Sequence, residues 1–357
     1  MIDLSLQTKV AQVAKNASTR HNQIDLKSLW ELLSSIDPPS FHAKLKNTNV
    51  EYPYGAIPVV ENPGVSLDSR ANAGPVVGID GSQIYPSPLH PVRWAYIQAL
   101  AYSPSLPIIH ETEFLSLDQS IAVDSDFQEW SEDKASIDFW RTLLEFKVAL
   151  KIVDAYPNHT LLMDYPLLPW VPRSDPSYGK RIKQYIDMID QLKGKRIVGI
   201  VSAPKSHLLI NLIAISDKFN GGQNKFPEVS DTALACAGLR PGQRSAIFKY
   251  AGSRNEVFLS RGIEICFFFI IIRDRDVVRV EIPDWAARDP VCVDLIHASI
   301  LKDSAALGYS YALAKAHQEV AIPLDIANSL HAVATREYIS SGGPLYGAAK
   351  MRAKGLS

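Results

Sequence analysis

Two short apolar segments of the sequence each end on an aspartate. VVGIDGS, residues 76–82, reaches Asp80, and TLLMDYPLL, residues 160–168, reaches Asp164. Side chains at strand ends of an open α/β sheet leave the core and can face a cleft. If the two strands are neighbours, the two carboxylates can share a divalent cation, and oxygen ligands select Mg²⁺ or Mn²⁺. The alternative is that each aspartate caps a following helix or turn.

Hydrolysis of a phosphodiester bond needs more ligands than two aspartates, because two cations about 3.5–4 Å apart stabilise the attacking and leaving oxygens. Glu145 lies on the expected helix just before the second aspartate. His317 follows Tyr309 by eight residues in GYSYALAKAHQE, which would place the two side chains roughly 80° apart around a helix. The alternatives are an exposed helix face for Glu145 and a half-buried structural histidine for His317.

Basic residues offer candidate contacts to phosphate. Lys205 follows the apolar segment RIVGIVS, where its charge could hold a phosphate or stabilise an anionic transition state. The net charge is −1, yet residues 180–205 hold seven bases against two acids and residues 240–279 hold eight against four. The second stretch contains Arg244 and Arg254, both candidates for DNA contacts. The alternative for all of them is a solvated surface.

The composition indicates an ordinary globular protein. The chain has 357 residues, of which 46% are apolar and 21% charged. The longest apolar run, residues 265–272, is far shorter than the ~20 residues that cross a bilayer. Three scattered cysteines fit reduced core thiols, so a cytoplasmic location is expected. GxxxxGK[ST], GxSxG and HExxH are absent, and the chain is therefore not expected to hydrolyse ATP.

The apolar periodicity predicts an α/β fold. An early run of strands, followed by alternating strands and helices, predicts a mixed sheet with helices on its faces. Helices are expected at residues 4–17, 25–36, 136–155, 178–192, 294–307 and 311–320. Strands are expected at residues 75–80, 92–102, 108–115, 160–164, 196–202, 263–273 and 277–282.

Further expectations concern the connections and the domain limits. Gly81-Ser82 is expected to break the first strand, EYPYGAIPVVENPG to be extended without regular structure, and residues 118–133 to form an exposed acidic loop. Residues 1–70 are expected to be a helical and extended accessory region, residues 71–335 the main domain and residues 336–357 a tail.

Six sequence elements together resemble the NurA nuclease family over about residues 70–330. The second element has Tyr165-Pro166 where many relatives have Gly-Ser, but it keeps the aspartate. The six elements, in the order and spacing of the family, are VVGIDGSQI, LLMDYPLL, IVGIVSAPKS, QRSAIF, RVEIPDW and GYSYALAKAH.

The resemblance implies an RNase H-like fold, Mn²⁺-dependent cleavage of DNA and a role at the ends of double-strand breaks. It also implies a homodimer that docks on a hexameric HerA-type translocase. The N-terminal helices and the apolar segment EICFFFIIIR, residues 264–273, could serve such contacts or could equally be core. The family's metal or catalytic roles fall on Asp80, Asp164 and His317, with Tyr309 beside them and Glu145 as a further candidate.

These observations lead to one hypothesis and two alternatives. A two-metal-ion deoxyribonuclease would hold Mn²⁺ or Mg²⁺ with Asp80, Glu145 and Asp164. His317 would complete the site or assist proton transfer, Tyr309 would orient His317 or pack on a nucleotide, and Lys205 would contact the scissile phosphate. The first alternative is a catalytically silent adaptor of a DNA translocase. The second, an actin-like sugar kinase, would need a second glycine-rich phosphate loop, which the sequence lacks.

Overall fold

The structure, a computed structural model, consists of two compact units. It describes residues 4–22, 24–47, 54–59, 65–66, 73–87, 90–116, 133–169, 178–219 and 229–344. Unit 1 comprises residues 1–74, 165–168 and 196–309, and unit 2 comprises residues 75–164, 169–195 and 310–357. The predicted acidic loop at residues 118–133 lies outside the described residues except for Asp133. The predicted limits at residues 70 and 335 stay a prediction.

Unit 2 contains a mixed sheet with the strand order β6-β3-β4-β5. β3 pairs with β6 in parallel, whereas the β3–β4 and β4–β5 pairs are antiparallel. The parallel register joins Val76 to Thr160 and Ile79 to Met163. The strands are β3 (Val76–Ile84), β4 (Trp94–Tyr102), β5 (Ile109–Ser116) and β6 (Thr160–Met163).

The expectation that Gly81-Ser82 breaks the first strand is wrong. β3 continues through both residues to Ile84, and Gly81 pairs with Ala99 of β4. β6 stops earlier, at Met163, so the second half of β3 extends beyond its parallel neighbour. Asp80 therefore lies inside a strand, at the point where the adjacent strand has just ended.

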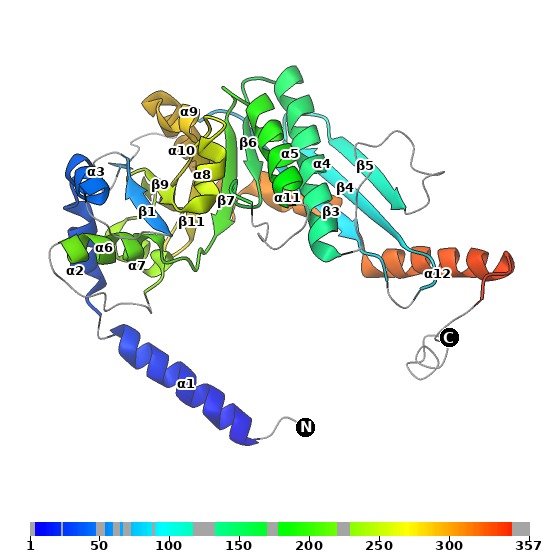
Figure 1. Ribbon diagram of the computed structural model, residues 1–357, viewed down its shortest axis with the longest axis horizontal. Coiled ribbons are helices and arrows are strands. Elements are labelled where there is room, and N and C mark those ends of the chain that lie inside the picture. Colours follow the sequence, from blue (N-terminus) through cyan, green and yellow to red (C-terminus); the bar gives the residue numbers. More distant parts are fainter. Residues whose placement is uncertain are drawn as a thin grey trace. The chain divides into compact units, whose positions relative to one another are not determined.

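Helices cover both faces of this sheet, and Figure 1 shows α4 and α5 on the near side of the strands with α11 behind them. α11 packs so closely that a Cβ atom on Gly78 would lie 2.3 Å from the backbone carbonyl carbon of Ala312. On the other face, α4 begins after Asp133, whose carboxylate accepts a 2.8 Å hydrogen bond from the Ser136 backbone N–H. The helices of unit 2 are α4 (Lys134–Ala155), α5 (Tyr178–Gln191), α11 (Tyr311–Val320) and α12 (Leu324–Ser340).

Unit 1 contains a second set of paired strands, all antiparallel. Its main order is β1-β9-β10-β11-β7, and β8 joins β10 to β2. The predicted hairpin is confirmed: β10 and β11 pair along their length, and the turn holds Asp274 at φ +43°. The strands are β1 (Gly55–Pro58), β2 (Val65–Ser66), β7 (Ile197–Ser202), β8 (Gln243–Arg244), β9 (Phe248–Ala251), β10 (Ile265–Ile271) and β11 (Val277–Pro283).

The strand pairing of unit 1 corrects one expectation and decides between two alternatives. The segment around Gly55 is not wholly irregular, because residues 55–58 form β1 against β9. Every residue of β10 is buried, and the strand has partners on both edges. The apolar strand within EICFFFIIIR is therefore core, which is one of the two readings that the sequence left open.

The helices of unit 1 include several that the apolar pattern did not predict. α2 begins as expected after Asp25, which accepts a hydrogen bond from the Ser28 backbone N–H at 3.1 Å. α10 begins four residues earlier than predicted, with Pro290 in its first turn and Asp289 as N-cap. The helices are α1 (Leu4–Asn22), α2 (Leu26–Ser34), α3 (Pro38–Asn47), α6 (Leu208–Phe219), α7 (Asp231–Gly238), α8 (Ser253–Leu259), α9 (Asp284–Ala287) and α10 (Pro290–Ser304).

Strands and helices thus alternate as the sequence predicts, and the α/β class with a mixed sheet is confirmed. In the described part of the chain, no helix combines the length and the apolar character that a membrane span requires.

Candidate functional site

Asp80 and Asp164 lie on adjacent parallel strands. The register that pairs Ile79 with Met163 places Asp164, the first residue after β6, opposite Asp80. Neighbouring strands are about 4.8 Å apart, and residues in parallel register point to the same face. Asp80 is buried and Asp164 is exposed. The backbones of the two aspartates therefore lie next to each other where β6 ends.

His317 reaches Asp80 from α11. Its Nδ1 lies 2.7 Å from Asp80 Oδ2, which is a hydrogen bond across 237 residues of sequence. The other carboxylate oxygen, Oδ1, accepts a hydrogen bond from the Gly81 backbone N–H at 2.8 Å. The imidazole is otherwise open, with 73% of its side chain exposed. Asp80 thus orients a histidine that still has access to solvent or a ligand.

Glu145 approaches the same part of β3 from α4, and it is completely buried. A Cβ atom on Gly81 would lie 2.4 Å from Glu145 Oε1, 2.8 Å from Arg141 Cγ and 2.9 Å from the backbone oxygen of Gln98. No real side chain tolerates such distances. Glycine is therefore needed at position 81 not to break the strand but to leave room for the Glu145 carboxylate.

Arg141, which sequence reasoning missed, lies between the two buried acids. Its Nη1 is 3.2 Å from Glu145 Oε1 and 4.0 Å from Asp80 Oδ1, and it donates a 3.1 Å hydrogen bond to the Gly81 carbonyl. The sequence signal for Arg141 is its spacing of four residues from Glu145, because residues four apart share one face of a helix. The site therefore contains a fixed positive charge as well as its carboxylates.

The donor set fits a hard divalent cation by its chemistry. It consists of carboxylates from Asp80, Glu145 and Asp164 and the imidazole of His317, the oxygen and nitrogen ligands that Mn²⁺ accepts. Two of these acids already gather around one positive group, the Arg141 guanidinium. Within the described residues, no three acidic, histidine or cysteine side chains come close enough together to hold one ion.

Tyr309 does not share a helix with His317, so this part of the sequence interpretation is wrong. Gly308 has φ +75°, and Ser310 is the N-cap of α11, accepting a hydrogen bond from the Leu313 backbone N–H. The helix therefore begins at Tyr311, and the expected angle between Tyr309 and His317 does not apply. Tyr309 is half-buried and belongs to unit 1.

Lys205 is exposed on the loop that follows β7 in unit 1, and buried polar groups hold this loop. Ala203, two residues before it, has φ +43°. The Ser206 hydroxyl donates to Asp231 Oδ2 at 2.6 Å, and Asp231 accepts the Leu208 and Leu209 backbone N–H groups at 2.9 and 2.8 Å. Asp231 thus caps α6, although burial raises the pKa of its carboxyl group.

The same network continues into the core of unit 1. Arg279 donates from Nη1 to Ser206 Oγ at 3.0 Å and pairs through Nη2 with Glu281 Oε1 at 2.9 Å. Glu281 is completely buried and also accepts the Tyr250 hydroxyl at 2.5 Å and the Leu167 N–H at 2.8 Å. Burial, with the nearby negative charge of Glu281, raises the pKa of Tyr250. The network anchors the loop that carries Lys205 to β11.

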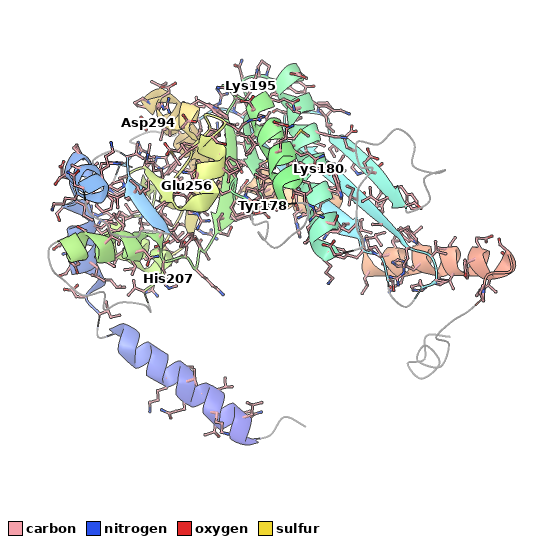
Figure 2. The ribbon with its side chains drawn as sticks, in the orientation of Figure 1. Tyr178, Lys180, Lys195, His207, Glu256 and Asp294 are labelled. Carbon is pink, nitrogen blue, oxygen red and sulfur yellow. The ribbon has the colours of Figure 1, made fainter. Side chains whose placement is uncertain are left out.

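The predicted basic contacts differ in their accessibility. Arg244 is buried, and its Nη2 is 3.2 Å from Asp294 Oδ1; Asp294 is labelled on α10 in Figure 2. A DNA phosphate would therefore compete with Asp294 for this guanidinium. Arg254 lies in α8, and its side chain is outside the described residues. Lys180 on α5 in unit 2 is exposed (Figure 2).

All four candidates that the sequence proposed as metal ligands, namely Asp80, Glu145, Asp164 and His317, belong to unit 2, where His317 contacts Asp80 and Arg141 contacts both Asp80 and Glu145. The remaining candidates belong to unit 1, namely Lys205, Tyr309, Arg244 and Arg254.

Comparison with known proteins identifies the family. The chain is similar to a crystal structure of the NurA nuclease from Sulfolobus solfataricus, with 13% identity and a TM-score of 0.54 over 95% of this chain and 98% of that one. A second crystal structure of NurA gives 12% identity and a TM-score of 0.41 over 82% and 93% of the two chains. The catalytic domain of human endonuclease V gives 12% identity and a TM-score of 0.33 over 80% and 86%. No match is found among curated proteins.

The first of these likenesses confirms the RNase H-like fold that the sequence resemblance implied. The NurA domain matches residues 74–322, a range that includes the two aspartates, Glu145 and His317. The match covers well over half of the sequence, and the chain therefore belongs to the NurA family.

Proposed function

We propose that this protein is a metal-dependent deoxyribonuclease that hydrolyses phosphodiester bonds in DNA. The observation that carries the proposal is the convergence on Asp80 of His317 from α11, of the helix α4 that holds Glu145, and of Asp164 from the adjacent strand. Membership of the NurA family, and likeness to a protein described as a NurA nuclease, support the same activity.

The carboxylates of Asp80, Glu145 and Asp164 would hold Mn²⁺ or Mg²⁺, with His317 as a further ligand or as a proton carrier. Two such ions would supply charge that stabilises the attacking and leaving oxygens. The chain itself supplies the placement: burial fixes Glu145, and the 2.7 Å hydrogen bond to Asp80 fixes the imidazole. Because Nδ1 makes this bond, the other ring nitrogen, Nε2, is the one that can exchange a proton with water or with the leaving oxygen.

The remaining assignments concern DNA and partner proteins. Lys205 is proposed to contact the scissile phosphate, Tyr309 to pack against a nucleotide, and Arg244 and Arg254 to contribute to DNA binding. The protein is further proposed to act in the cytoplasm as a homodimer with a HerA-type hexameric translocase, in the resection of broken DNA ends. Exposed apolar side chains on α1, at Leu6, Val10 and Val13, are compatible with a protein contact.

A cleavage assay with matched asparagine variants tests the activity. Asp80→Asn and Asp164→Asn keep the size of each side chain but remove its charge, and both are expected to abolish Mn²⁺-dependent cleavage of linear DNA. Asp190→Asn, on the exposed side of α5, serves as the control and should cut like the wild type. Full cleavage by either active-site variant, or by the wild type in EDTA, would exclude the proposed chemistry.

The same assay separates the nuclease from a catalytically silent adaptor. An adaptor would bind a hexameric translocase but would cut neither single-stranded nor duplex DNA with any divalent cation. Mn²⁺ titration of the wild-type protein by isothermal calorimetry adds a direct measurement, because an adaptor has no need to bind the ion.

A further inference from the structure

Arg141 is a cationic side chain that pairs with both buried acids of the candidate site. Its Nη1 faces Glu145 Oε1 at 3.2 Å and Asp80 Oδ1 at 4.0 Å, while the Glu145 side chain has no exposed surface. Two neighbouring carboxylates repel each other unless a positive charge lies between them. In the ion-free protein, the Arg141 guanidinium supplies that charge.

We infer that Arg141 is an internal counter-cation that holds Asp80 and Glu145 in place until a divalent ion takes over its position. The inference rests on the proposed function, because it assigns these two acids to an ion site. The inference adds to the proposed function a residue that competes with the ion. The carboxylate oxygens that pair with the Arg141 guanidinium cannot at the same time be fully available as metal ligands. Arg141 is a positioning residue in this scheme.

The contacts of Arg141 allow such an exchange. Arginine keeps its charge at any physiological pH, so it can make room only by moving. Its side chain is 23% exposed, whereas that of Glu145 is 0% exposed, so the guanidinium is the partner with a route to solvent. Its hydrogen bond to the Gly81 carbonyl, 3.1 Å long, can be replaced by water when the side chain leaves.

Mn²⁺ binding to the full-length protein tests the inference without reference to cleavage. Arg141→Met retains the apolar stem and removes the charge, and Arg141→Lys retains a charge without the planar fork. Arg288→Met is the control, because Arg288 also pairs with an acid four residues away on a helical turn, at 2.5 Å from Asp284, but in unit 1. Calorimetry measures the affinity for Mn²⁺, and thermal melting measures stability, before and after a chelator removes the metal.

The expected result has two parts. Arg141→Met should bind Mn²⁺ about tenfold more tightly than the wild type or better, a factor equivalent to 1.4 kcal/mol. Its metal-free form should melt about 2–4 °C lower, with a larger rise on adding Mn²⁺. Arg141→Lys should lie between the two, and Arg288→Met should bind Mn²⁺ like the wild type.

Unchanged or weaker Mn²⁺ binding by Arg141→Met would overturn the inference, and so would a loss of DNA affinity in that variant without any change in its affinity for the ion. The two proposals fail differently. A wild-type protein that neither binds Mn²⁺ nor cuts DNA refutes the nuclease assignment. If the wild-type protein binds Mn²⁺ and cuts DNA, and Arg141→Met binds Mn²⁺ with the same affinity, only the role of Arg141 is refuted.

Discussion

Replacing Gly81 by alanine tests whether the Glu145 carboxylate must lie against β3. The added methyl group would be 2.4 Å from Glu145 Oε1 and 2.9 Å from the backbone oxygen of Gln98. The carboxylate can move away only within a buried environment, and the Gln98 oxygen belongs to the paired strand β4 and cannot move independently. The substitution therefore displaces a proposed metal ligand without removing any charged group.

The change in the free energy of unfolding of Gly81→Ala follows from two opposing effects. Alanine at an unstrained glycine position raises the free energy of unfolding by about 0.4–1 kcal/mol, because the unfolded chain is less flexible. Overpacking of a buried site lowers it by about 1–3 kcal/mol. We expect a net loss of about 1–2 kcal/mol. A shift of the carboxylate by about 1 Å should lower kcat roughly 10²-fold.

Urea unfolding and Mn²⁺-dependent cleavage measure the two effects. Gly179→Ala is the control, because a Cβ atom on Gly179 would meet no atom within 4 Å. Gly81→Ala combined with Glu145→Asp should recover part of the lost stability, since the shorter acid withdraws from the methyl group, giving a coupling of about 0.5–3 kcal/mol. Wild-type stability and activity in Gly81→Ala, or strictly additive effects in the double variant, would refute the reasoning.

Three further predictions concern stability. Burial and the charge of Arg244 lower the pKa of His297 to about 3. As the pH falls from 6.5 toward 3, the unfolded chain therefore binds a proton that the folded protein does not bind, and the free energy of unfolding decreases. The melting temperatures at pH 5 and pH 7 should differ less in His297→Phe than in the wild type. Glu281→Ala should lower the free energy of unfolding in urea by about 3–5 kcal/mol by leaving Arg279 buried without its acid, and Glu281→Leu with Arg279→Met should cost less. Asp133→Ala should cost about 0.5–2 kcal/mol by removing the cap of α4, and an unchanged urea midpoint would contradict this.

The positions of the two aspartates could be predicted because apolar strands that end on an acid leave a strong local pattern. The sequence could not show that β3 continues past Asp80, because glycine and serine normally favour a turn. Here the pairing of Gly81 with Ala99 and the packing of Glu145 against it outweigh that preference. Strand pairing depends on contacts between residues far apart in the chain, so the register between Asp80 and Asp164 needed the structure.

The two errors at the site have identifiable causes. The eight-residue spacing predicts that Tyr309 and His317 share a helix, but Gly308 adopts a positive φ and Ser310 is the N-cap at which α11 begins. The local sequence does not single out Arg141, because arginine four residues before glutamate is common on solvated helix faces. Its meaning depends on the burial of Glu145, which the local sequence does not reveal.

The absence of a side chain at Gly78 has a consequence for how the site operates. A Cβ atom there would lie 2.3–2.5 Å from the backbone of Ala312 and Leu313, so α11 rests on β3 with main chain against main chain. At this position the two main chains are in direct contact, with no side chain of residue 78 to separate them. This contact sets the distance between α11 and β3, and with it the height of the His317 backbone above the strand.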